Sequence, residues 1–183
     1  MIISFQITEQ EYFEFSYYTN WTAPWNKMKK IRYYLICTLI GLILITAGIL
    51  TNKIKTLESN IAVALYFSAI YFPLLLIMTK QRFRRSATKI YYNTNNKNLF
   101  SQLKVSFSKA GISGKSEFSE FQYQWSGIKK MSSTKNTYIL YSSNISGLVI
   151  PKRIFKTVEE KESFEKMLAQ YLAMQTDLPD IGK

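Results

Sequence analysis

The sequence predicts an α+β membrane protein, in which a two-helix transmembrane hairpin is inserted into a small β domain closed by a C-terminal amphipathic helix. Three observations predict this fold class. Two apolar runs of 18 residues without any charge occur at 33–50 and 61–78. Short segments of alternating apolar and polar residues follow the second run, and one such segment precedes the first run. An apolar stripe with helical spacing comes near the end of the chain.

The two apolar runs have the length and composition of membrane spans. An 18-residue helix is about 27 Å long, close to the hydrocarbon thickness of a bilayer. The alternative is a buried helical hairpin in a soluble protein, but 183 residues hardly provide the soluble shell that such a core would need. We therefore predict transmembrane helices at 33–50 and 61–78, joined by a short extracytoplasmic loop at 51–60.

Basic residues flank the outer ends of the hairpin and predict its orientation. The loop carries two lysines and one glutamate, whereas both flanks are strongly basic. By the positive-inside rule, both termini are cytoplasmic and the protein is a multi-pass protein of the cell membrane. The first 15 residues have no basic or apolar region typical of a signal peptide. The juxtamembrane anchors predicted from this pattern are Lys29, Lys30, Arg32, Arg82, Arg84 and Arg85.

The segment before the hairpin, 1–32, is predicted to hold a strand and an aromatic helix. Ile3, Phe5 and Ile7 alternate with polar residues, as in a half-buried strand. Thr8 followed by Glu11 is a capping box, which predicts that a helix begins there. A lone strand of this length is unstable, so we expect it to pair with the sheet beyond the hairpin. The hairpin would then be an insertion between two parts of one cytoplasmic domain.

Three regions are expected after the second span. A basic connector covers 79–98, a β domain with a closing helix covers 99–172, and a flexible tail covers 173–183. Alternation and turn residues predict strands at 102–108, 121–125, 137–142 and 145–150, with a further strand beginning near 128–131. Thr157 and Glu160 form a second capping box. The apolar stripe that includes Phe164 and Leu168 is interpreted as packing against the sheet rather than as a partner-binding groove.

Composition excludes several kinds of chemistry. The chain has no histidine, and its one cysteine, Cys37, lies inside the first span. A zinc site, a Cys–His pair and a Ser–His pair therefore cannot be built. Glycine-rich nucleotide-binding motifs are absent from the sequence. We expect no enzyme activity, no cofactor and no metal, and because the aromatic residues have the pattern of a core, no nucleic-acid binding.

A basic corner formed by Lys152 and Arg153 is the candidate binding site. The chain carries a net charge of +12, most of it beyond the second span. Pro151 ends the last predicted strand, and the two cations stand before the last helix, where a phosphate of an anionic lipid could bind. The alternative is a strand-to-helix corner with solvated cations. Trp125, Pro151 and Phe155 are the candidate structural anchors.

Several of these residues carry a resemblance to a known family. Trp125 and Ile128, the pair Tyr138 and Leu140 with Tyr141, and the run from Ile150 through Pro151-Lys152-Arg153 to Phe155 resemble the YcxB-like bacterial membrane proteins. The resemblance extends over most of the chain. It implies a cytoplasmic domain similar to bacterial PH-like folds, in which a strongly bent sheet or barrel is closed by a C-terminal helix. It also implies a bacterial inner or plasma membrane, but no established activity.

Two function classes follow from these observations. The first is a non-catalytic integral membrane protein that presents a PH-like binding or scaffold domain for anionic phospholipid headgroups or a protein partner. The second is an inner-membrane immunity protein that protects against a secreted, membrane-acting toxin. Both classes require the lipid bilayer as a partner, and both leave a homo-oligomer open. Neither class requires catalytic residues.

Overall fold

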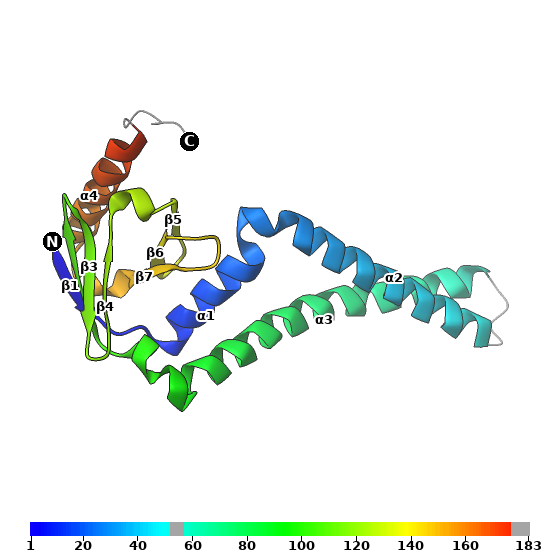
Figure 1. Ribbon diagram of the computed structural model, residues 1–183. Helices are drawn as coiled ribbons and strands as arrows, with labels where there is room; N and C mark the ends of the chain where they lie inside the picture. The colour runs from blue at the N-terminus through cyan, green and yellow to red at the C-terminus, as the bar shows by residue number, and fades with distance from the viewer. Residues whose placement is uncertain (52–56, 177–183) are drawn as a thin grey trace, which may run out of the picture. The chain divides into compact units, whose positions relative to one another are not determined.

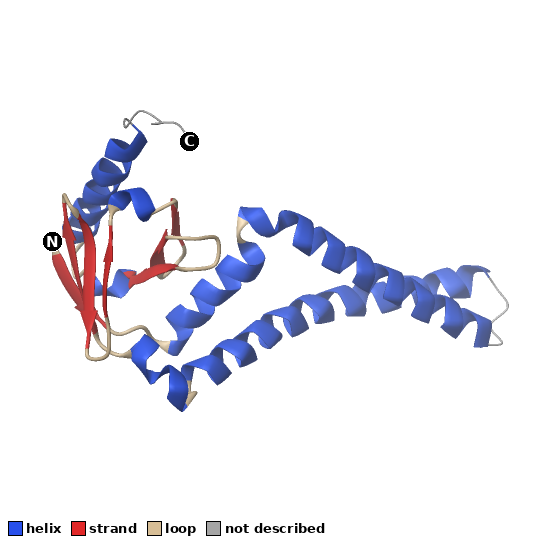
Figure 2. Ribbon diagram, in the orientation of Figure 1, coloured by secondary structure: helices blue, strands red, loops and turns tan. Residues whose placement is uncertain are grey.

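The chain divides into two compact units. The computed structural model describes residues 1–51 and 57–176 (Figure 1). One unit combines Met1–Thr19 with Ala87–Lys183, and the other is Asn20–Ser86. Helices occur in both units, whereas the strands form two antiparallel sheets within the first (Figure 2). The predicted α+β class is therefore confirmed.

The two sheets contain four and three strands. Their strand orders are β1-β2-β3-β4 and β5-β6-β7, and every neighbouring pair is antiparallel. The strands are β1 Ile2–Phe5, β2 Leu103–Ser108, β3 Gly111–Ser116, β4 Glu120–Tyr123, β5 Lys130–Ser133, β6 Thr137–Tyr141 and β7 Gly147–Pro151. The unit that holds these sheets also contains helices α1 Glu9–Tyr17 and α4 Val158–Thr176 and three short 3₁₀ segments, Thr94–Phe100, Trp125–Gly127 and Lys152–Ile154.

Strand β1 completes the larger sheet across the two long helices. Ile3 lies opposite Val105 of β2, and Phe5 lies opposite Leu103. The ladder extends to the first residue, since the Met1 amino group donates to the Phe107 carbonyl at 2.9 Å and the Phe107 amide donates to the Met1 carbonyl at 2.8 Å. The predicted pairing is confirmed, so the first residues belong to the same folding unit as residues 103–176.

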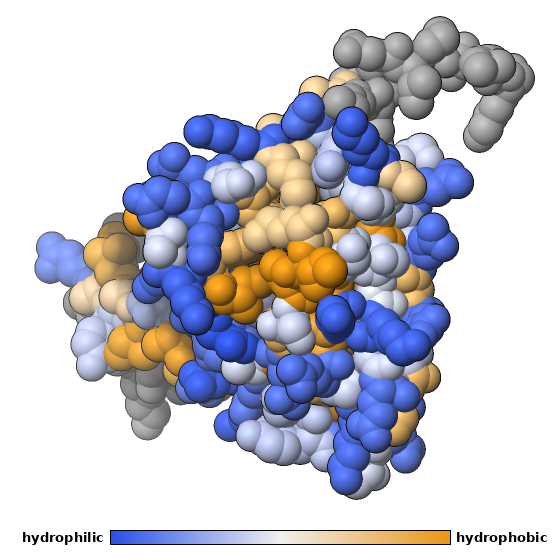
Figure 3. Space-filling model, turned by 90° about the vertical axis from the view of Figure 1, so that its left-hand side faces the viewer, coloured by the Kyte–Doolittle hydropathy of each residue, from blue (hydrophilic) through white to orange (hydrophobic). Residues whose placement is uncertain are grey.

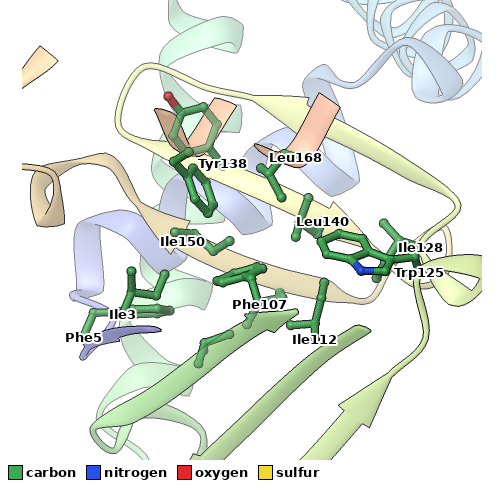
Figure 4. Close-up of a cluster of buried hydrophobic side chains, with 13 residues drawn as sticks. Ile3, Phe5, Phe107, Ile112, Trp125, Ile128, Tyr138, Leu140, Ile150 and Leu168 are labelled. Atoms are coloured by element: carbon green, nitrogen blue, oxygen red, sulfur yellow. The ribbon is translucent and has the colours of Figure 1, made fainter. Parts of the chain in front are cut away.

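The core lies between the two sheets and α4 (Figure 4). Phe107 and Ile112 of the larger sheet point toward Leu140 and Ile150 of the smaller one. Phe164 of α4 is fully buried, and its ring centroid is 5.4 Å from that of Phe107. The predicted packing of the apolar stripe against the sheets is therefore confirmed. Burial of side chains of this size contributes about 2–3 kcal/mol each.

The core is not sealed on every side. Some apolar residues at its margin are only partly buried, among them Ile154, Phe155, Met167 and Tyr171. Figure 3, which views the face that carries β1 and α4, shows apolar side chains in the middle of that face with hydrophilic ones around them. Helix α4 continues to Thr176, so residues 173–176 are helical and do not belong to the predicted tail. The rest of that tail, 177–183, lies outside the described residues.

The β region differs from the sequence-based expectation in two details. Strand β3 was not predicted, because its sequence GISGKS contains two glycines and has only one large apolar residue. Gly114 leaves room for the ring of Phe121 on β4, since a Cβ on Gly114 would lie 2.1 Å from that ring and would displace it. Trp125 was predicted to continue the alternation of β4, but it begins a 3₁₀ turn instead. This change of backbone direction buries Trp125, whereas Tyr123 stays exposed.

The second unit holds most of the two long helices, α2 Lys27–Thr51 and α3 Leu57–Tyr91. Within it, Gly41 faces the ring of Tyr71, whose hydroxyl donates to the Cys37 carbonyl at 2.9 Å. Trp21 is buried against Phe83 and two tyrosines of α2, with ring centroids 5.1–5.9 Å apart. The two helices are therefore packed against each other through aromatic and small residues.

One helical segment of the described chain, Pro24–Gly48, is long and apolar enough to cross a membrane, and 6% of its apolar window is buried. The second predicted span, 61–78, lies within α3, although the side chains of several of its residues are not described. Residues 52–56 of the predicted loop are outside the described chain. Within the predicted connector 79–98, α3 runs on to Tyr91 and the 3₁₀ segment Thr94–Phe100 follows.

Candidate functional site

The structure gives Lys152 of the basic corner partners within its own domain. The Lys152 amine donates to the Ser133 hydroxyl at 2.7 Å and to the Thr134 carbonyl, and it lies 4.8 Å from the ring centroid of Tyr138. Burial, together with the nearby charge of Lys161, lowers the pKa of Lys152 below its usual value. The corner is also not adjacent to the start of α4, which begins at Val158. Lys152 therefore holds the turn between β5 and β6.

Arg153 forms an ion pair with a buried carboxylate of α1. Its Nε donates to Oε1 of Glu11 at 2.7 Å, and its Nη2 donates to Oε2 of Glu11 at 3.2 Å and to the Gln6 carbonyl at 2.7 Å. The Glu11 side chain is 6% exposed, against 53% for Arg153. The hydrogen bond to Glu11 raises the pKa of Arg153. Since 142 residues separate the partners, the sequence holds no signal for this pair.

A second carboxylate of α1 joins the same region to the smaller sheet. Glu14 accepts hydrogen bonds from the Asn136 amide and, at 3.3 Å, from the Thr134 hydroxyl, both in the β5–β6 turn. Nearby, the hydroxyls of Thr19 and Tyr141 are 2.7 Å apart and buried. The N-terminal segment is thus tied to the smaller sheet by α1 and to the larger sheet by β1.

The three candidate anchors all lie in the domain that contains this corner. Trp125 is buried, donates its indole N–H to the Ser108 carbonyl at 2.8 Å, and lies 4.8 Å from the ring of Tyr171. Pro151 is fully buried at the end of β7. The Phe155 ring is 4.8 Å from that of Phe164. These positions agree with a structural role for Trp125, Pro151 and Phe155.

The segment that contains these three anchors is the part of the chain that matches a known family. Residues 107–168 match the family model of the YcxB-like proteins. The resemblance drawn from the sequence is therefore confirmed for this segment, which covers the last two residues of β2, all of β3 to β7 and slightly more than the first half of α4. The resemblance was expected to extend over most of the chain, but the matched segment leaves out β1 and the two long helices. Comparison with curated proteins gave no match, and comparison with solved structures gave none either.

An apolar pocket of about 370 Å³ opens beside the YcxB-like segment. Its walls come from α1, from the 3₁₀ segment Thr94–Phe100, from β2 to β4, and from the start of β7. The lining residues that carry large side chains are Ile7, Tyr12, Phe15, Leu99, Phe100, Leu103, Phe121, Ile145, Leu148 and Val149. Because they are spread over five parts of the chain, the sequence pattern gave no sign of this pocket. Its size suits one or two large apolar groups of a ligand.

The cations predicted as juxtamembrane anchors lie outside the YcxB-like segment, on the two long helices. Lys29 donates to the Asn20 carbonyl at 3.4 Å, and Lys30 and Arg32 follow on the first turns of α2. On α3, the side chains of Arg82, Arg84 and Arg85 are all exposed. Arg82 and Arg85 line a second pocket of about 320 Å³, which Arg84 does not line.

The carboxylates and hydroxyls described in this domain form hydrogen bonds that stabilise its fold. The Tyr138 hydroxyl donates to Glu165 of α4, and burial with this hydrogen bond raises the pKa of Tyr138. Among residues 1–51 and 57–176, no cluster of His, Cys, Asp and Glu could hold a metal ion. Two pockets of the described structure, one lined mainly by large apolar side chains and one that includes two arginines, are suited to a ligand.

Proposed function

We propose that this chain is a non-catalytic integral membrane protein that presents a PH-like binding domain at the cytoplasmic face of a bacterial inner membrane. One observation carries the proposal: β1 precedes both long helices, yet it pairs with β2, which follows them. The chain must therefore leave the domain and return to it. A transmembrane hairpin meets this requirement, because its two spans return the chain to the side from which it started.

Apolar exposure on the long helices supports a membrane location. The exposed large side chains of α2 include Leu35, Ile36, Leu39, Ile40, Leu42, Ile43 and Leu44, and those of α3 include Ile61, Leu65, Ile70, Leu74, Leu76 and Ile77. An apolar surface of this extent is unfavourable in water but suits the hydrocarbon region of a bilayer. A core helix of a soluble protein would be mostly buried, unlike Pro24–Gly48.

Sheet topology supports the PH-like assignment of the domain. A four-stranded and a three-stranded antiparallel sheet enclose one core, and the C-terminal helix α4 packs on it. This arrangement agrees with what the YcxB-like resemblance implies, namely a bent sheet closed by a C-terminal helix. Such a domain serves binding rather than catalysis, in keeping with the absence of histidine and the membrane-embedded position of Cys37.

The ligand that suits the β domain best is an apolar segment of a protein partner. Lys152 and Arg153 already have partners within the domain, which weakens the prediction that they bind lipid phosphate. The pocket lined by Tyr12, Phe121 and Leu148 is mainly apolar and would take large side chains. No feature of the described residues is specific to the immunity alternative.

Cysteine labelling of the full chain tests this proposal. In a Cys37→Ala background, Glu58→Cys at the start of α3 and Ser113→Cys on β3 each place one thiol at an exposed position. With a membrane-impermeant maleimide on intact spheroplasts, we expect Glu58→Cys to react and Ser113→Cys to react only after permeabilisation. Equal labelling of Ser113→Cys before and after permeabilisation would overturn the proposed topology, and so would recovery of the chain in the soluble fraction.

A further inference from the structure

The second pocket lies between the two long helices, within the unit Asn20–Ser86. Tyr33 of α2 forms one side, and Met78, Thr79, Gln81, Arg82 and Arg85 of α3 are among the residues that form the other. Thr79 is 6% exposed, its hydroxyl donates to the Leu75 carbonyl at 2.8 Å, and it lies 3.2 Å from the hydroxyl of Tyr33. Partly buried hydrogen bonds therefore fix the wall where the two helices meet.

The chemistry of the pocket suits a phosphate group. Arg82 and Arg85 are three residues apart, so their side chains lie on the same face of α3. Both side chains are exposed, and within the described part of the chain neither forms an ion pair with a carboxylate. None of the described residues that line the pocket is acidic. Arginine binds phosphate oxygens through paired N–H groups, and the Gln81 amide adds a further donor.

The position of the pocket suits a lipid rather than a free anion. Met78 is the last residue of the apolar run 61–78, and the two arginines follow within the next two turns of α3. The pocket thus joins an apolar part at Met78 to a cationic part at Arg82 and Arg85. A phospholipid has the same arrangement, with apolar acyl chains next to a charged headgroup phosphate. Basic pockets between membrane helices bind anionic headgroups.

We propose that this pocket binds the phosphate of an anionic glycerophospholipid of the cytoplasmic leaflet. The inference rests on the membrane location given under Proposed function, and it goes beyond it by assigning a specific lipid site to the hairpin. Arg82 and Arg85 hold the phosphate, Gln81 donates to the headgroup, and Met78 contacts the first part of an acyl chain. Arg84, on a different face of the helix, does not take part.

Lipid binding by the purified full-length protein in detergent tests the site. Native mass spectrometry would measure the affinity for phosphatidylglycerol and for phosphatidylcholine, with inorganic phosphate as the free-anion probe. We expect the Arg82→Gln/Arg85→Gln variant to bind phosphatidylglycerol about thirtyfold more weakly than the wild type, since each well-placed cation contributes about 1 kcal/mol. The matched control, Lys80→Gln/Arg84→Gln, removes the same charge from α3 outside the pocket. It should stay within about threefold of the wild type.

Each contrary result has a definite meaning. An equal loss in both double variants would overturn the site in favour of general electrostatics, and so would equal affinity of the wild type for the two lipids. Binding of inorganic phosphate as tight as that of the lipid would also overturn it, in favour of a free-anion site. The Glu58 and Ser113 labelling keeps this inference separate from the proposed function. Correct topology without lipid preference contradicts only the lipid site, whereas incorrect topology contradicts the membrane hairpin.

Discussion

Phe5→Ala will destabilise the β domain by about 3–5 kcal/mol, the range measured for truncating a buried aromatic side chain. Phe5 is 4% exposed and belongs to the core, most of whose residues lie between Val105 and Leu168. The loss should therefore appear in strands that follow two long helices along the chain. Pulse proteolysis of the full-length protein in detergent would measure it as a change in the free energy of unfolding of the β domain.

Strand β1 itself offers the matched control for this variant. Ile2 lies on the opposite face of the same strand and is 63% exposed. We expect Ile2→Ala to change the free energy of unfolding by no more than about 0.5 kcal/mol, as is usual for a surface position. Similar effects of the two substitutions would mean that the first residues do not contribute a buried face to the sheet.

Arg153→Ala should be the next most damaging substitution, at about 3 kcal/mol. Removing one partner of a buried ion pair costs about 3–5 kcal/mol, and the lower end applies because half of the Arg153 side chain is exposed. The cost arises from Glu11, whose buried carboxylate would lose its cation. The double variant Glu11→Gln/Arg153→Ala should therefore be more stable than Arg153→Ala alone. Chemical denaturation of the four proteins gives the coupling energy.

Lys156→Ala is the control for this cycle. Lys156 is an exposed cation three residues further along, outside the ion pair, and its loss should change stability by no more than about 0.5 kcal/mol. If adding Glu11→Gln to the Arg153→Ala variant did not raise its free energy of unfolding, the pair would not stabilise the domain. Arg153 would then be available for the lipid contact predicted from the sequence.

Local patterns predicted those parts of the fold that depend on nearby residues. The alternation at Ile3 and Phe5 predicted β1, and the Thr8 and Glu11 capping box predicted the start of α1, where both reciprocal hydrogen bonds are present. Strand β3 lacks such a pattern, because two of its six residues are glycines. Gly111 has a positive φ, and Gly114 leaves room for the ring of Phe121. These requirements come from the neighbouring strand and leave no periodic signal.

The candidate site was predicted less well than the fold, for a related reason. Lys152 and Arg153 were recognised as a basic corner, but their partners Thr134 and Glu11 are distant in sequence. An exposed pair of cations and a pair engaged within the domain look alike in a sequence. The apolar pocket combines residues from five parts of the chain, and only the folded domain brings them together.

The central claim, that β1 closes the sheet across an inserted hairpin, is tested most directly by an engineered disulfide. Ser4 and Lys104 face each other in β1 and β2 as a non-hydrogen-bonded pair, with Cα atoms about 4.5 Å apart in such ladders, a separation within the range of disulfides. Lys115 lies opposite Lys104 on β3, one strand further away.

In membranes that contain the full-length Cys37→Ala protein, mild oxidation should crosslink Ser4→Cys/Lys104→Cys nearly completely, as detected by peptide mass spectrometry. It should leave Ser4→Cys/Lys115→Cys open, because two strand spacings, about 10 Å, exceed the reach of a disulfide. Absence of the first crosslink, or equal crosslinking of both pairs, would contradict the account.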